Sequence, residues 1–347
     1  MAKYTAIGGQ ALIEGILMRS PEKTALAVRK PDKEIEIVPF NAKSVREKYK
    51  ILKLPVIRGV IAFAESLIQG YKAMMISAEK SGYTDIEEEE KKPKEETPEE
   101  ISEENKPEEK EPEKTEEKKE TGTLITVVMI IGTVLGVALA VVLFMLVPRL
   151  AVKGLEALFG TAFSKIARSS IEQLIKLIVL VAYMWGVSLM PDIKRVFMYH
   201  GAEHKTIFCY EKGLELTVEN VKKQKRFHPR CGTSFLILMI LVSIIISTLV
   251  QLIFPGVYGI VWLWVVAKIL MVPVICGLGF ELLRVCGKYD NLFTKIVSAP
   301  GLWLQRITTK EPQDDMMEIA IAALRAAEPD NPDVDRSVDK RAKDIGE

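Results

Sequence analysis

The sequence has few of the residues that most often carry chemistry: three histidines and four cysteines occur in 347 residues. No apolar stretch follows the polar, Gly-rich start MAKYTAIGGQ, so we expect no cleaved secretory signal and an N-terminus that stays in the cytoplasm. In that compartment the four cysteines predict free thiols rather than a disulfide framework. Basic residues do not gather into an aromatic-interleaved patch, so we expect no nucleic-acid partner.

Charge is also missing from several long apolar runs, although 27% of the residues are charged and 48% are hydrophobic. A helix needs about 20 apolar residues to cross the hydrocarbon core of a bilayer. Four runs meet or approach this length, namely 124–147, 171–190, 235–254 and 257–280. The loop at 191–233 carries nine Lys or Arg residues, so the positive-inside rule places this loop and both termini in the cytoplasm. We therefore expect a multi-pass protein of the cell membrane.

Outside these runs the sequence predicts a β-hairpin and an amphipathic helix. The stretch 24–40 alternates on either side of a Pro-Asp turn, which is typical of a hairpin. From Pro55 onward, large apolar residues recur at helical spacing. We predict that this stripe packs against the rest of the protein, with a position in the membrane interface as the alternative. The stripe consists of Ile57, Val60, Ile61, Ala64, Leu67, Ile68, Tyr71, Met74 and Met75.

The fold class is therefore mainly α: a polytopic α-helical membrane protein with about four transmembrane helices and a small β-containing N-terminal element. One stretch is almost wholly acidic residues, Lys, Pro, Ser and Thr, and it cannot bury enough apolar surface to offset its ordering entropy, so we predict a disordered linker. The predicted segments are a β-containing element (1–54), an amphipathic helix (55–82), the linker (83–122), transmembrane helices 1 and 2 (123–190), a cytoplasmic His-rich loop (191–233), transmembrane helices 3 and 4 (234–284), and a C-terminal interfacial segment, helix and tail (285–347).

The three histidines lie close together in the sequence. The residues around the first two have helical periodicity, so His200 and His204 are neighbours on one helix face. With Glu203 between them, they match the inverted zinc-peptidase pattern H-x-x-E-H. His228 and Cys231, separated by Pro-Arg, resemble one half of a mixed Cys/His zinc site. We therefore predict that these three histidines and Cys231 bind a divalent metal ion, with zinc as the favoured ion.

The alternative is that the three histidines only hydrogen-bond loop carbonyls at a membrane interface. The remaining cysteines fit a metal site less well: Cys209 lies about 140° around the helix from His204, and Cys276 and Cys286 are expected to be small buried hydrophobic residues. Glu14, within the apolar stretch GGQALIEGILM, is either a turn residue or a ligand or base that reaches the site from outside the loop.

Four longer motifs, GGQALIEGILMRSP, YHGAEHKTIFCYE, RFHPRCGTSF and APGLWLQRITTKEP, carry a family resemblance over nearly the full chain. The sequence resembles the YqhQ-type family of bacterial multi-pass membrane proteins, a family of unknown function described as predicted metal-dependent enzymes. The acidic linker is not part of the family pattern. The resemblance implies a shared set of polar residues, namely Glu14, Arg19, His200, Glu203, His204, His228, Arg230 and Cys231.

Three functions remain open at this point. As an enzyme, the protein would hold the ion through its three histidines and leave one position for water, with Glu203 as general base. Arg19 or Arg230 would stabilise an anionic intermediate, Glu14 is a further catalytic candidate, and a lipid head group or membrane peptide would be hydrolysed.

As a scaffold or assembly factor, the protein would instead use Cys231 to complete a closed structural site. Transport of a divalent cation ranks third, because the predicted spans contain few ionisable residues. A homo-oligomer would ease that objection. The lipid bilayer is the expected partner, and the sequence names no protein partner.

Overall fold

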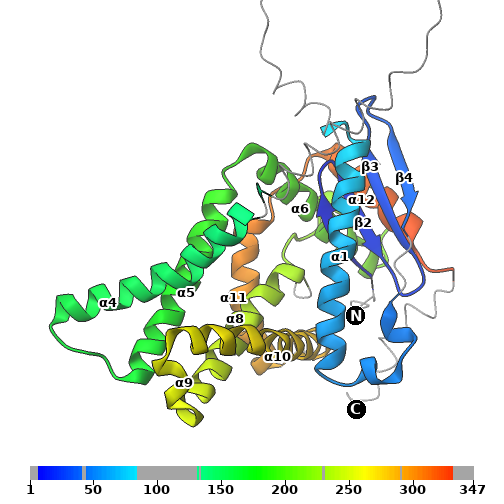
Figure 1. Cartoon of the computed structure of the whole chain (residues 1–347). Helices are drawn as coiled ribbons and strands as arrows, with labels where there is room; N and C mark the ends of the chain where they lie inside the picture. The colour runs from blue at the N-terminus through cyan, green and yellow to red at the C-terminus, as the bar shows by residue number, and fades with distance from the viewer. Residues whose placement is uncertain are drawn as a thin grey trace, which may run out of the picture. The chain divides into compact units, whose positions relative to one another are not determined.

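The computed structural model describes residues 7–40, 44–83, 131–132, 134–228, 231–289 and 291–330. By internal contacts the chain divides into one unit of residues 1–89 and 181–347 and a second unit of residues 90–180. The described part is mainly helical and contains one four-stranded sheet, which confirms the predicted fold class (Figure 1). The predicted disordered linker at 83–122 lies outside the described residues, apart from Tyr83.

The sheet belongs to the first unit and is an antiparallel meander in the order β1-β2-β3-β4. The strands are β1 (Gly8–Leu12), β2 (Gly15–Arg19), β3 (Thr24–Arg29) and β4 (Ile35–Pro39). The predicted hairpin at 24–40 is confirmed, with Ala27 opposite Ile37. The first two strands were not predicted, because β2 is buried on both faces and reads as a continuous apolar run without alternation.

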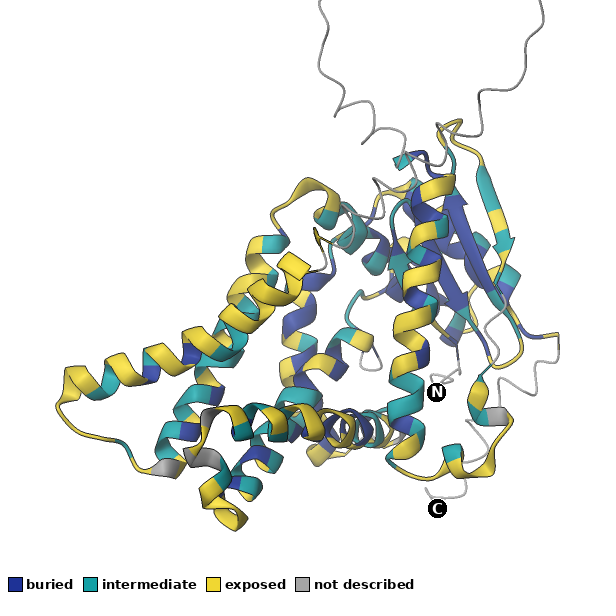
Figure 2. Ribbon diagram, in the orientation of Figure 1, coloured by how far each residue is buried: buried dark blue, intermediate teal, exposed yellow. Residues whose placement is uncertain are grey.

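Helices cover both faces of this sheet (Figure 2). On one face, Ile16, Met18 and Ala27 pack with α12 (Asp314–Ala327) and with the helix α6 (Pro191–Glu211). On the other face, Leu17 and Leu26 pack against Ala73 of α1 (Ile57–Lys80). The layered core therefore fixes α6 on one face of the sheet, next to β1.

The helix predicted from Pro55 is confirmed as α1, but the prediction that its large apolar stripe packs inward is wrong for most of the stripe, although Met74 packs beside Ala73. Small residues make its packed face: a Cβ added to Gly70 would lie 2.7 Å from the side chain of Gln10. Tyr71 and Met75 of the predicted stripe are instead exposed. A close approach between a helix and a sheet requires small side chains, and hydrophobic periodicity alone does not detect them.

Two candidate membrane spans belong wholly to the first unit, namely α8 (Gly232–Ile253) and α10 (Val261–Lys288), joined through the short α9 (Pro255–Gly259). They are antiparallel, since Gly279 near the end of α10 lies against Phe235 at the start of α8. After α10, the helix α11 (Leu292–Thr308) packs along α8. Lys310 then donates a backbone hydrogen bond of 2.8 Å to Phe197 of α6, which brings the chain back to that helix.

In the second unit, the π-helical turn η3 (Val142–Leu146) continues into α4 (Val147–Phe159), and α5 (Lys165–Val187) begins there. Glu156 of α4 forms an ion pair with Arg168 of α5. Among the described residues, four helices are long and apolar enough to cross a membrane, which confirms the predicted number. The first of them extends to Phe159, beyond the predicted end of that span at residue 147.

Candidate metal centre

The site is built on α6, which is buried along most of its second half although many of its residues are polar. Pro191 occupies the first turn and Asp192 lies near the positive end of the helix, both favourable at a helix start. A Cβ added to Gly201 would lie 2.0 Å from the carbonyl oxygen of Lys310, so only glycine allows this chain segment to pass so close. The helix predicted around the first two histidines is confirmed.

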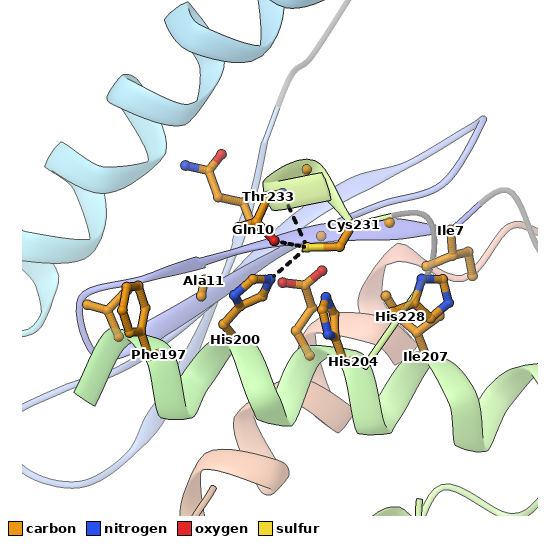
Figure 3. Close-up of a pocket in the computed structure, with 15 residues that line it drawn as sticks. Ile7, Gln10, Ala11, Phe197, His200, His204, Ile207, His228, Cys231 and Thr233 are labelled. Carbon is orange, nitrogen blue, oxygen red and sulfur yellow. Dashed lines mark hydrogen bonds between the residues drawn. The ribbon is translucent and has the colours of Figure 1, made fainter. Parts of the chain in front are cut away.

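Three of the four predicted ligands come together. One donor atom each from His200, His204 and Cys231 lies within 4.8 Å of the others. The Nε2 atom of His200 is 3.1 Å from the Sγ atom of Cys231, and the two imidazole ring centroids are 4.4 Å apart. Figure 3 shows both rings projecting from α6 toward the thiol.

Each of the two imidazoles is held by a backbone carbonyl on its other nitrogen. The Nδ1 atom of His200 lies 2.9 Å from the carbonyl oxygen of Thr308, and that of His204 lies 2.5 Å from the carbonyl oxygen of Arg226. A carbonyl oxygen only accepts hydrogen bonds, so Nδ1 carries a proton in both rings, and in the neutral form of each ring Nε2 keeps its lone pair. Burial lowers the pKa of His204 below its usual value, which also favours the neutral ring.

Cys231 stands at the N-cap of α8, where its Sγ atom accepts a hydrogen bond of 3.4 Å from the backbone N–H of Thr233. The first candidate span of this unit therefore begins directly at the cluster. Among the described residues, the other three cysteines are buried elsewhere, and Cys209 in particular packs in the core between the sheet, α6 and α12. Its exclusion from the predicted ligands agrees with this position.

His228 is not part of the three-residue cluster. Its Nε2 atom lies 3.6 Å from a carboxylate oxygen of Glu211, and its ring packs against Phe208 at 4.7 Å between centroids. The side chain of Gln305 holds the His228 backbone, accepting from its N–H at 2.7 Å and donating to its carbonyl oxygen at 2.8 Å. The structure thus directs this imidazole toward Glu211, which helical spacing places on the same face of α6 as His200 and His204.

Glu203 lies beside the cluster and is buried, with 5% of its surface exposed. Burial raises the pKa of its carboxyl group to about 7, although a hydrogen bond from the backbone of Gly9 and the nearby His200 oppose that rise. A Cβ added to Gly9 would lie 3.0 Å from the carboxyl carbon of Glu203. The Gly-Gly start of β1 is therefore part of the site, a role that the sequence did not reveal.

A cavity of about 500 Å³ opens next to these groups. One wall is polar and holds the three candidate ligands, Glu203 and His228, whereas Ile7, Ala11, Val196, Phe197 and Ile207 contribute apolar surface. The strand β1, the helix α6 and the first turn of α8 line it together (Figure 3). The arrangement can therefore accept a ligand that is partly apolar and can present it to two imidazoles, a thiol and a carboxyl group.

Glu14 and Arg19 do not line this cavity. Glu14 occupies the turn between β1 and β2 with φ of 49°, and its carboxylate is bound by Arg195 and by the hydroxyl of Tyr199 at 2.9 Å. This agrees with the interpretation of Glu14 as a turn residue. Arg19 donates a hydrogen bond of 3.0 Å to Gln69 of α1. Arg230 lies outside the described residues.

Comparison with known proteins gives a family but no activity. Residues 54–330 match the family described as "Protein of unknown function (DUF1385)". The chain is 36% identical to "Uncharacterized protein YqhQ" of Bacillus subtilis (strain 168) over 320 residues, which cover 92% of this chain and 91% of that protein. No solved structure matches the chain.

Proposed function

The chain belongs to this family of unknown function, and we propose that it is a membrane protein that binds a divalent metal ion through His200, His204 and Cys231 and uses it for hydrolysis. The site would face the cytoplasmic side of the membrane, as the basic residues of the 191–233 segment suggest. The first turn of the candidate span α8 lines the cavity, which supports a reaction at the membrane interface.

The observation that carries this proposal is the pair of carbonyl-anchored imidazoles. Histidine ligands in metal sites usually donate their second ring N–H to a carbonyl or carboxylate, which fixes the tautomer and the ring orientation. Both His200 and His204 have this arrangement, through Thr308 and Arg226, with the unprotonated nitrogens directed at one thiol. Histidines that merely satisfied loop carbonyls would not need a shared target for their other nitrogens.

The chemistry of the donor set fits a borderline-soft ion. Two imidazole nitrogens and one thiolate favour zinc over magnesium or calcium, which prefer oxygen ligands. When bound by three such ligands, zinc polarises the bond of a substrate and lowers the pKa of water in its fourth position. We propose zinc for this reason, and His228 is not among the proposed ligands because Glu211 lies next to its Nε2 atom.

Glu203 is the proposed general base. With a pKa of about 7, its carboxyl group exchanges a proton near neutral pH, which suits both removal of a proton from water and its return to a leaving group. The Gly9 backbone orients the carboxylate, and the closed packing around it limits access of bulk water. The apolar wall of the cavity would hold the hydrophobic part of a lipid or of a membrane peptide.

A structural metal site is the second candidate, because a thiolate is among the proposed ligands and the cluster joins α6 to the start of α8. The two candidates differ in the number of protein ligands. A closed structural site has four, whereas a hydrolytic site has three and an open position.

The test is the metal content of the detergent-purified full-length protein, measured by mass spectrometry. We expect about one equivalent of zinc in the wild type, near-complete loss in His204→Ala and in Cys231→Ser, and retention in Cys209→Ser, which removes another buried thiol. Glu203→Gln should keep the metal. A wild type without metal would contradict the proposal. Metal that is retained after both ligand substitutions would show that other residues bind the ion.

A structural role would be indicated by a different pattern. If the metal-free variants unfold and aggregate while Glu203→Gln has no effect on hydrolysis of any substrate that the wild type turns over, the metal stabilises the fold and does not act in chemistry.

A further inference from the structure

α1 has an apolar face that no other described part of the protein covers. We define its outer face as Leu67, Ile68, Tyr71 and Met75, whose exposed fractions are 59%, 58%, 57% and 40%. At about 100° per residue, this face lies opposite the small residues that pack on the sheet. A helix that borders water normally places charged and polar residues there. The exposed apolar face therefore indicates a neighbour other than water.

α1 crosses the two candidate spans of its unit rather than running alongside them. Gly59 approaches α10 closely, since a Cβ there would lie 2.8 Å from the Cβ of Phe280. One turn later, the ring of Phe63 lies 5.5 Å from that of Phe235 at the start of α8. From Gly70 onward, α1 packs on the sheet instead (Figure 1). α1 therefore crosses the pair near the start of α8 and within the second half of α10, which is the orientation of a helix that lies along a membrane surface.

The segment before α1 adds positive charge to the same region. It contains the short helices η1 (Val45–Glu47) and η2 (Lys50–Lys53), and we call residues 44–54 the basic turn. Its basic residues are Arg46, Lys48, Lys50 and Lys53, and its exposed apolar residues are Val45, Tyr49, Ile51 and Leu54. Buried Glu65 of α1 fixes the basic turn, accepting hydrogen bonds of 2.9 Å from Ser44 and 2.8 Å from the Val45 backbone.

We infer that the outer face of α1 and the basic turn form an in-plane anchor in the leaflet on the metal-centre side of the membrane. Acyl chains cover the outer face, and anionic head groups pair with the lysines of the basic turn. Interleaved basic and exposed apolar residues are typical of such interfacial segments. The surface is continuous with the spans through Gly59 and Phe63, so a bilayer around the spans reaches it without a rearrangement of the unit. The inference is independent of the metal centre.

The test uses the full-length protein in vesicles of phosphatidylcholine, with and without phosphatidylglycerol. Leu67→Cys, Tyr71→Cys and Met75→Cys are spin-labelled one at a time. Ser66→Cys and Lys80→Cys are the matched controls, because both positions are exposed and lie about 100° or more around the same helix from every residue of the outer face. The four native cysteines are buried, so the introduced thiols label preferentially.

We expect labels on the outer face to collide several-fold more often with oxygen, which concentrates in lipid, than with a water-soluble nickel chelate. The two control labels should show the reverse preference. Equal access of the nickel chelate at both sets of positions would overturn the inference. Dipolar broadening between labels on neighbouring copies would also overturn it, since a second copy of the chain would then cover the face.

The anionic part of the inference has its own test. The double substitution Lys50→Gln and Lys53→Gln should lower the oxygen-to-nickel ratio at Leu67→Cys in vesicles with phosphatidylglycerol. It should leave that ratio unchanged in pure phosphatidylcholine. An equal ratio for the two proteins in both vesicle types would show that the basic turn does not recognise anionic head groups.

Discussion

The helices α6 and α1 depart from the usual distribution of side chains in opposite ways. α6 buries Glu203, His204 and Lys205, whereas α1 exposes Leu67 and Tyr71. A buried polar group costs free energy unless it is hydrogen-bonded, and a large exposed apolar face favours association. The buried polar residues of α6 therefore indicate chemistry inside the protein, and the exposed apolar residues of α1 indicate a surface that meets another medium.

Both helices pack through glycines at the points of closest approach, and this is where they are alike. Gly201 of α6 passes the backbone of Lys310, and Gly70 of α1 passes the side chain of Gln10. The packing rule is therefore the same in the two helices. They differ in what the remaining faces meet. The remaining face of α6 meets a cavity with a polar wall, and in our proposal that of α1 meets the bilayer.

The largest effect is expected from a substitution of a buried polar residue in α6. Glu203→Gln removes the proton acceptor while keeping the size of the side chain, so the rate of hydrolysis should fall by about 10²–10⁴-fold with the metal retained. The measurement is turnover of lipid head-group and peptide substrates selected by a screen of the wild type. Glu219→Gln, an exposed carboxylate on α7 (Val218–Lys222), is the control and should leave the rate unchanged.

A smaller but still large effect is expected at the close approach of α6. Gly201→Ala forces a methyl group against the carbonyl of Lys310 and should destabilise the protein by about 3 kcal/mol, measured by thermal unfolding in detergent. It should also weaken metal binding, because Thr308, which anchors His200, lies on the same chain segment. Gly154→Ala on α4, where a Cβ meets nothing within 4 Å, should instead be neutral or slightly stabilising. Equal destabilisation by the two changes would contradict the packing argument.

The two hydrogen bonds between the Gln305 side chain and the His228 backbone should contribute somewhat less to the stability of the protein. Gln305→Ala leaves a buried N–H and a buried carbonyl without their side-chain partner, and should cost about 2 kcal/mol. Chemical or thermal unfolding measures this cost. Gln313→Ala, at an exposed position without a capping hydrogen bond, is the matched change and should have little effect. A stability loss of the same size at both positions would show that the hydrogen bonds of Gln305 to the His228 backbone contribute little.

The smallest effect is expected on the outer face of α1. Leu67→Ser should change the free energy of unfolding in detergent by less than about 0.5 kcal/mol, because the side chain makes little contact within the protein. The same substitution at the fully buried Leu324 of α12 should cost several-fold more. A large loss at Leu67 would mean that the protein itself covers this face.

Features that depend on local patterns were predictable from the sequence. Apolar runs longer than a bilayer gave the four spans, the alternating stretch 24–40 gave the hairpin, and helical spacing gave the pairing of His200 with His204. Cys231 was also predictable as a ligand candidate, since a thiol three residues after a histidine is a common chelating pattern. Each of these signals lies within a few residues of the feature that it predicts.

Features that depend on contacts between distant segments were not predictable. The anchors of the two imidazoles are backbone carbonyls, which every residue has, so no side-chain pattern marks Thr308 or Arg226. The position of His228 depends on Gln305, which is 77 residues away. Likewise, Glu14 is held by Arg195 across the fold, and the packed face of α1 consists of small residues that hydrophobic periodicity does not detect.

The measurement that tests the central claim most directly is the absorption spectrum of the full-length protein loaded with cobalt(II) in place of the native ion. The wild type and Cys209→Ser should show an intense near-ultraviolet band from thiolate-to-cobalt charge transfer, together with the visible bands of a tetrahedral ion. Cys231→Ser should lose the near-ultraviolet band. A wild-type spectrum of hydrated cobalt, or a charge-transfer band that persists in Cys231→Ser, would contradict a metal centre built on His200, His204 and Cys231.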